Sequence, residues 1–122
     1  MEFGQAISTC FSKYATFAGR ATRAEYWYFV LFTSVATVVL GIIDLALPYG
    51  VLEPIFSLAT LLPSIAVMIR RLHDVDRSGW WWLIVFVPLV GWILLIVWLS
   101  TRGTSGPNRF GSAPDRAVPT LA

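Results

Sequence analysis

Six ionisable side chains fall within eight consecutive residues near the middle of the chain, and they are the groups best suited to chemistry. They are Arg70, Arg71, His73, Asp74, Asp76 and Arg77. An arginine can bind a phosphate or a carboxylate through two hydrogen bonds, and a histidine beside an aspartate can titrate near neutral pH. The segment lies between two long apolar runs and leads into Trp80, Trp81 and Trp82. We therefore expect it either at a membrane surface or in a buried polar site.

Two interpretations of this charged segment stay open. In the first, its arginines contact the phosphates of membrane lipids while Asp74 and Asp76 cap or pair locally. In the second, Arg70 or Arg71 holds an anionic head group or the carboxylate of a partner, and His73 and Asp74 form a proton-responsive pair. A metal site is not favoured, because no second group of His or Cys residues completes a tetrahedral set.

A second polar group precedes the first apolar run and consists of Arg20, Thr22, Arg23 and Glu25. Thr22 and Glu25 have the spacing of a capping box, which predicts the start of a helix. The arginines are typical of the positively charged anchors that flank membrane spans. A sharper hypothesis is that Glu25 pairs with Arg70 or Arg71 and so fixes how two helices pack.

The composition favours a membrane protein. Of 122 residues, 57% are hydrophobic and 13% are charged, and a soluble domain of this size could not bury so much apolar surface. The net charge of +2 and the scattering of the basic residues argue against nucleic-acid binding. A single cysteine, Cys10, excludes an intramolecular disulfide.

The pattern of apolar residues predicts an all-α membrane protein with a single membrane domain over 1–122. An amphipathic helix is expected over 3–17, lying in the membrane interface. Each segment of about 20 apolar residues is long enough to cross a bilayer. Three such spans are expected, over 26–43, 51–69 and 80–99, followed by an irregular tail over 101–122. Pro63 should kink the second span unless Thr60 or a neighbouring helix satisfies the carbonyl that it frees.

Lysine and arginine placement predicts the orientation. Basic residues precede the first span and separate the second from the third, which puts the N-terminus and the 70–79 loop in the cytoplasm. The aromatic anchors expected at this interface are Tyr26, Trp27, Trp80, Trp81 and Trp82. Three spans put the tail outside, against the charge rule. A re-entrant third segment that turns at 88–91 is the alternative, disfavoured because a lipid-exposed turn is not tolerated at that depth.

Three motifs in order along the chain carry a resemblance to a known family. They are FAGRATRAEYW at 17–27, RRLHD followed by RSGWW at 70–81, and GTSGPNRFG at 103–111. The chain resembles the bacterial inner-membrane proteins grouped as domain of unknown function 805. One departure is Arg102, where that family commonly has proline. The resemblance implies a small multipass protein of the inner (plasma) membrane and implies no reaction, substrate or cofactor.

The expected function is that of a non-enzymatic accessory subunit or regulator in a larger membrane assembly. Its expected partners are membrane lipids and other integral membrane proteins or a second copy of itself, with no nucleic acid and no cofactor. A homo-oligomeric channel or transport component is the alternative, and an enzyme acting on lipid head groups is less favoured, since no catalytic arrangement is evident.

Overall fold

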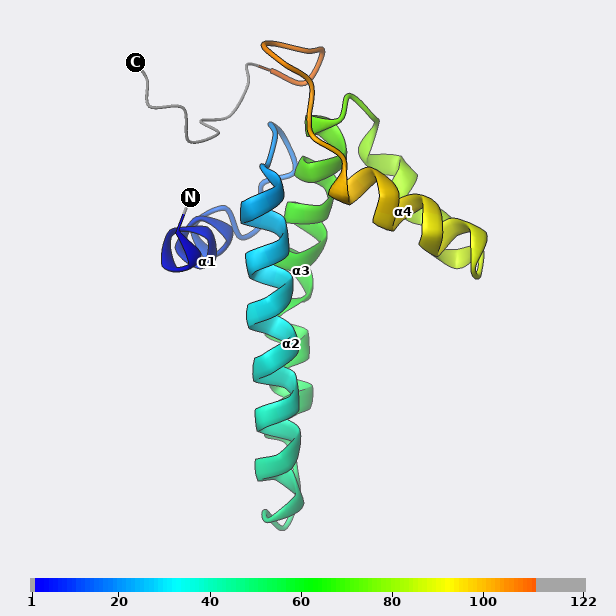
Figure 1. The fold of residues 1–122 in the computed structure, drawn as a ribbon. Helices are drawn as coiled ribbons and strands as arrows, with labels where there is room; N and C mark the ends of the chain where they lie inside the picture. The colour runs from blue at the N-terminus through cyan, green and yellow to red at the C-terminus, as the bar shows by residue number, and fades with distance from the viewer. Residues whose placement is uncertain (1, 112–122) are drawn as a thin grey trace.

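The structure is a computed structural model that describes residues 2–111, and within this range it is helical without a β-strand. The elements follow the order α1 (Phe3–Ser12), α2 (Arg23–Leu45), α3 (Leu52–Asp74), the 3-10 helix η1 (Gly79–Phe86) and α4 (Val90–Ser100). Helices α2 and α3 lie side by side as a long antiparallel pair, and the shorter elements join it near one end (Figure 1).

Helices α2 and α3 are each long and apolar enough to cross a membrane. Helix α2 extends beyond the expected span 26–43 at both ends, whereas α3 begins one residue after the expected start at 51 and continues past the expected end at 69. At their connection, the Asp44 carboxylate accepts hydrogen bonds from the backbone amides of Leu52 and Glu53, at 3.0 and 2.9 Å. These amides have no partner within their own helix, so Asp44 caps the start of α3.

Helix α1 ends at Ser12, five residues before the expected end at residue 17, because the chain turns at 13–15. The turn brings Tyr14 to α3, where its hydroxyl donates to the carbonyl of Ala59. Pro63 has no N–H and therefore leaves this carbonyl without its usual partner. Tyr14 therefore provides the hydrogen bond that the Ala59 carbonyl lacks. Thr60, the residue suggested for this role, donates instead to the Phe56 carbonyl at 2.9 Å.

The expected third span over 80–99 is wrong as a continuous helix. The segment forms η1, a turn, and then α4, which packs back against η1. Leu89 has a left-handed backbone (φ 65°) directly after Pro88. A Cβ at Gly91 would lie 1.9 Å from the Ile84 carbonyl oxygen, so glycine allows the two arms to approach. The indole of Trp92 donates to the Val85 carbonyl at 2.8 Å and links them.

Both ends of this hairpin lie at the same end of the molecule. The backbone amide of Thr104 donates to the Asp74 carbonyl at 2.8 Å, which places the segment after α4 against the end of α3. Three spans would place residues 101–111 at the opposite end of the molecule from the 70–79 loop, and the structure does not place them there. The turn at 88–91 matches the path of the disfavoured alternative. Residues 112–122 of the expected tail lie outside the described residues.

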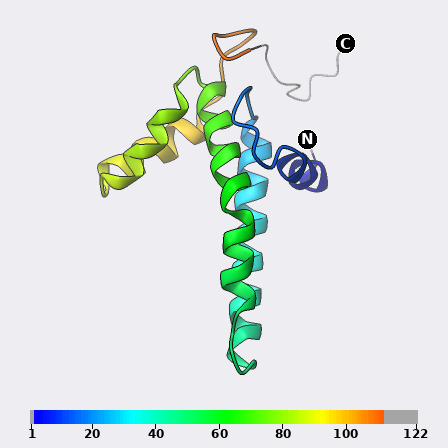
Figure 2. The ribbon, with the colours of Figure 1, turned by 180° about the vertical axis from the view of Figure 1, so that it is seen from behind.

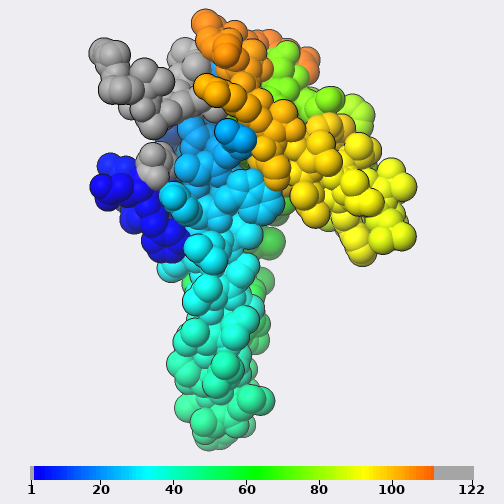
Figure 3. All heavy atoms as spheres, in the orientation of Figure 1, coloured from blue at the N-terminus to red at the C-terminus, as the bar shows by residue number. Residues whose placement is uncertain are grey.

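The hairpin leaves the helix pair at an angle, on the side away from α1 (Figures 1 and 2). In the space-filling view, α4 leans outward and the far half of α2 stands clear of it (Figure 3). The buried core lies where α1 and α4 each pack against α2 and α3, and it includes Cys10, Phe29, Val67 and Leu95. The far halves of α2 and α3 present mostly exposed apolar side chains.

Candidate functional site

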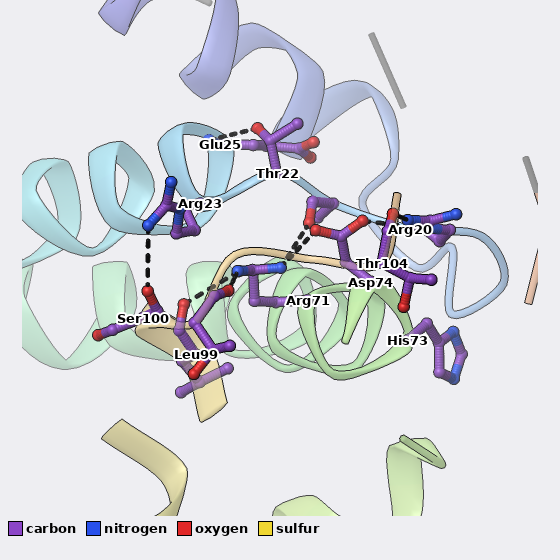
Figure 4. Close-up of polar contacts among 12 residues, drawn as sticks. Arg20, Thr22, Arg23, Glu25, Arg71, His73, Asp74, Leu99, Ser100 and Thr104 are labelled. Carbon is purple, nitrogen blue, oxygen red and sulfur yellow. Dashed lines mark hydrogen bonds and ion pairs between the residues drawn. The ribbon is translucent and has the colours of Figure 1, made fainter. Parts of the chain in front are cut away.

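Asp74, the last residue of α3, is at the centre of a buried charge cluster that we call the Asp74 cluster: Arg20, Arg71 and Asp74. Its Oδ1 atom lies 3.0 Å from Nε of Arg20, and its Oδ2 atom lies 2.5 Å from Nη1 of Arg71. All three side chains are almost fully buried. Buried charges are expensive unless paired and hydrogen-bonded, and here each carboxylate oxygen has its own arginine (Figure 4).

Arg20 extends the cluster to the segment after α4. Its Nη2 donates to the Thr104 carbonyl at 2.6 Å, and its Nη1 donates to the carbonyls of Gly106 and Gly111 at 2.7 and 3.3 Å. The three sequence motifs therefore meet in one network, with Arg20 from the first, Asp74 from the second and these carbonyls from the third. Arg20 therefore fixes the loop between α1 and α2 against the end of α3 and the segment after α4.

Arg71 holds the end of α4. Its Nε donates to the Leu99 carbonyl at 3.0 Å, and its Nη2 donates to the Thr101 carbonyl. From α2, Trp27 donates to Leu99 at 3.2 Å and Arg23 donates to Ser100 at 3.4 Å. The last carbonyls of a helix lack internal partners and carry partial negative charge. These donors satisfy them and fix the base of the hairpin.

Arg70 and Glu25 form a second buried ion pair, one of the two pairings left open by the sequence. Nη1 of Arg70 lies 2.5 Å from Oε2 of Glu25. The Nε and Nη2 atoms of Arg70 are buried without a partner among the described residues, so Arg70 depends on Glu25 for its charge compensation. The Cys10 thiol lies 3.7 Å from the same carboxylate oxygen, which ties α1 to the pair.

Thr22 caps α2, because its hydroxyl accepts from the backbone amide of Glu25 at 3.1 Å. The Glu25 carboxylate turns to Arg70, where a full capping box would have directed it back to the Thr22 amide. The sequence therefore predicted the start of α2. The Glu25 carboxylate points to Arg70 because this buried arginine requires a partner for its charge.

His73 does not pair with Asp74, although the two are neighbours in sequence. Its ring points away from the ion pairs (Figure 4), and its Nδ1 lies 2.9 Å from the Gly19 carbonyl oxygen. The ring stacks on Phe110, with 4.0 Å between centroids. The expected proton-responsive pair of His73 and Asp74 is therefore wrong as a direct contact.

The remaining charges of the motif lie at the surface. Asp76 pairs with Arg109 at 3.3 Å, and both side chains are exposed. The Arg77 guanidinium lies 4.2 Å from the ring centroid of Trp98, a cation–π contact with α4. Arg109 is exposed and Arg77 is half-buried, whereas Arg70 and Arg71 are enclosed by the protein.

The expected aromatic anchors likewise divide into residues at the surface and residues packed within the protein. Trp80 and Trp81 are exposed, and Trp82 is half-buried. Tyr26 is buried in the core and Trp27 is bonded to α4, so these two pack within the protein. Sequence reasoning missed Tyr14 and the carbonyls of the third motif. A proline that frees a carbonyl was the only signal for Tyr14, and backbone acceptors give no signal in a sequence.

Together, the fold and the site define a small helical membrane protein whose charged motifs bind one another. Among residues 2–111, no group of His, Cys, Asp and Glu side chains could hold a metal ion. The chain belongs to the family described as protein of unknown function DUF805, whose model matches residues 14–112.

Two inner-membrane proteins of Escherichia coli K12 are similar over most of their length. YhaI is 49% identical over 105 residues, covering 83% of this chain and 87% of YhaI. YhaH is 45% identical over 107 residues, covering 83% of this chain and 88% of YhaH. The uncharacterised protein YiiR is 33% identical over 107 residues, which cover 87% of this chain and 68% of YiiR. No solved structure matches the chain. The chain is thus a protein of the bacterial inner membrane.

Proposed function

We propose that this chain is a non-catalytic interaction subunit, which associates with other integral membrane proteins through helix faces that its own fold leaves uncovered. The observation that carries the proposal is a contrast between two regions. The charged side chains of the motifs are mostly buried and paired with one another. The outer faces of α2 and α3 are apolar and exposed. A protein whose charged side chains stabilise its own packing and whose apolar helix faces stay uncovered is better suited to docking than to catalysis.

One face of α2 offers a continuous apolar stripe. Leu31, Val35, Val38 and Ile42 follow one another at intervals of three or four residues, and each is more than half exposed. This spacing aligns them along one side of a helix. Within a bilayer such a stripe can face lipid or pack against another helix through van der Waals contacts. We call it the α2 stripe and propose it as the partner-binding surface.

The orientation follows from the positions of the cations. No lysine or arginine occurs between residues 26 and 69, which hold both spans and their connection. With the hairpin returning, Arg102 and Arg109 join the basic residues at the end opposite that connection. Three spans would have placed these basic residues outside, against the charge rule, and a returning hairpin does not. The charge rule then supports a cytoplasmic N-terminus and a cytoplasmic 101–111 segment.

The proposal is tested by gentle extraction of the tagged protein from its native membrane, followed by native mass spectrometry. A complex of defined stoichiometry with another integral membrane protein is expected. Val35→Trp combined with Val38→Trp should dissociate it, whereas the matched change Leu58→Trp on exposed α3 should leave it intact.

Three results would contradict the proposal. A monomer without protein partners would remove its basis. A discrete homo-oligomer that conducts ions in liposomes would favour the channel alternative. Turnover of a lipid head group by the purified protein would favour an enzyme.

A further inference from the structure

A cavity of about 450 Å³ lies between α3, η1 and the loop that follows α1, outside the charge network. Its volume is typical of small-molecule sites, which span about 300–1,000 Å³. Apolar side chains form most of its lining: Phe17, Ile65, Ile69, Trp80 and Trp82. Two polar side chains, His73 and Ser78, complete it. The site has the composition of a pocket for an amphiphile.

Along α3, the lining of the cavity changes from polar to apolar. His73 and Ser78 lie at the cytoplasmic end of α3, whereas Ile69 and Ile65 are one and two turns further along the helix. Eight residues of helix correspond to about 12 Å. An occupant would therefore place its head group near the membrane surface and its chain along α3, parallel to the lipid chains.

The hydrogen-bonding capacity of His73 indicates what kind of head group fits. The Gly19 carbonyl can only accept, so the Nδ1 atom 2.9 Å away carries the ring hydrogen. In the neutral ring Nε2 is then an acceptor, and it has no hydrogen-bond partner among the described residues. Gly79 lies beside this atom, because a Cβ there would be 3.4 Å from Nε2, and it packs closely on Ile69, whose Cγ2 would be only 2.5 Å from that Cβ.

Ser78 provides the complementary group. Its oxygen accepts from the Trp80 amide at 3.3 Å, which leaves its hydroxyl hydrogen free to donate. An alcohol can donate to His73 and accept from Ser78 at the same time. No lysine or arginine lines the cavity, and an anionic head group would therefore enter it without charge compensation.

From this geometry we infer that the cavity binds a neutral single-chain lipid with a free hydroxyl head group, held by His73 Nε2 and the Ser78 hydroxyl. The inference is independent of the proposed docking role, because it uses a different surface from the α2 stripe. A protein that failed to bind partners could still bind this ligand, and the reverse also holds.

Photocrosslinking of the purified full-length chain in lipid nanodiscs tests the inference. The probe is hexadecanol with a diazirine in its alkyl chain, compared with its methyl ether and with the corresponding alkyl phosphate. Saturable labelling of residues 65–82 by the alcohol is expected. Both analogues should label at least about fivefold more weakly: the ether loses the hydrogen bond to His73, and the charge of the phosphate would be buried without compensation.

Variants separate the cavity from the general lipid surface. Ile69→Trp fills the cavity and should abolish saturable labelling, whereas Ile42→Trp, the same change on exposed α2, should not. His73→Asn keeps a donor for Gly19 but loses the Nε2 acceptor, so the preference for the alcohol over its ether should disappear. Phe110→Leu removes the ring that stacks on His73 and contacts Arg109, keeps the Nε2 acceptor, and should retain that preference.

Several results would contradict the binding of a neutral hydroxyl lipid in this cavity. Labelling by the ether or the phosphate that equals labelling by the alcohol would overturn the head-group assignment. Non-saturable labelling, or equal losses in Ile69→Trp and Ile42→Trp, would overturn the cavity as the site. Should Ile69→Trp fail to fold, the comparison of His73→Asn with Phe110→Leu decides the matter.

Discussion

Arg20 and Asp74, which are 54 positions apart in the sequence, form a buried ion pair in which Nε and Oδ1 are separated by 3.0 Å. The remaining donors of Arg20 reach the carbonyls of Thr104 and Gly106. One arginine thus connects the loop before α2, the end of α3 and the segment after α4. This connection explains why residues so far apart in the sequence can act as one structural unit.

Asp74→Asn should loosen that unit. It removes the charge that compensates both Arg20 and Arg71, and breaking a buried ion pair typically costs about 3–5 kcal/mol. Limited proteolysis of the protein in detergent should then cut within 101–111, a segment to which Arg20 donates three hydrogen bonds. Thermal unfolding measured by circular dichroism should show the loss of stability.

Asp76→Asn is the matched control, since Asp76 forms an exposed pair with Arg109. Exposed pairs contribute about 0–1 kcal/mol, so this variant should resist the protease like the parent protein. Equal protease sensitivity of the two variants would show that the Asp74 cluster does not hold the segment.

Glu25 and Arg70 should be strongly coupled in a double-mutant cycle. Glu25→Gln alone leaves the buried Arg70 without its ionic partner and should cost about 3–5 kcal/mol of stability. Combining it with Arg70→Met removes the stranded charge, so the double variant should be more stable than Glu25→Gln alone. Denaturant titration of all four proteins measures the coupling, and strictly additive losses would contradict the pair.

Tyr14 should stabilise the fold through the carbonyl that Pro63 leaves free. Tyr14→Phe removes the donor to Ala59 and should cost about 1–3 kcal/mol, the penalty for an unsatisfied buried acceptor. In a Pro63→Ala background the helix regains its own N–H donor, and Tyr14→Phe should then cost less. Thermal melts of the four proteins provide the comparison. An equal cost in both backgrounds would disprove the compensation.

Cys10 should be unreactive in the folded protein. Burial, and to a smaller extent the nearby Glu25 carboxylate, raise the pKa of its thiol to about 12 against an opposing effect of Arg70. A raised pKa keeps the thiol protonated at pH 8, and the thiolate is the reactive species.

Maleimide labelling of Cys10 at pH 8 should therefore be at least about a hundredfold slower than labelling of an exposed cysteine. The exposed comparison is Ser12→Cys combined with Cys10→Ala, on the same helix. Denaturation should equalise the two rates. Equal rates in the folded state would mean that α1 does not pack as described.

Periodicity and caps made the two spans predictable. Thr22 marks the start of α2 by its own hydroxyl, and each span is a long apolar run that needs no knowledge of its neighbours. The ion pair of Glu25 with Arg70 could be anticipated because both charges sit at the same end of adjacent antiparallel helices. Such features depend on local sequence or on simple topology.

The hairpin and the network of carbonyls could not be predicted in the same way. Pro88 and Gly91 signalled weakness in the third apolar segment, but hydropathy alone scored it as a span. The turn is fixed by contacts across it, such as Trp92 with Val85. The anchoring of its base depends on backbone carbonyls, including that of Leu99, that receive Arg71 and Trp27. Every residue has a backbone carbonyl, so no residue type indicates which carbonyls accept these hydrogen bonds.

The side of the membrane on which the third motif lies tests the central claim, that the three motifs form one cytoplasmic unit. In a Cys10→Ala background, Ser105→Cys marks the third motif and Tyr49→Cys marks the connection between α2 and α3; both positions are exposed. A membrane-impermeant maleimide should label Tyr49→Cys in right-side-out vesicles and Ser105→Cys only in inverted vesicles. Labelling of both positions from the outside would contradict the account.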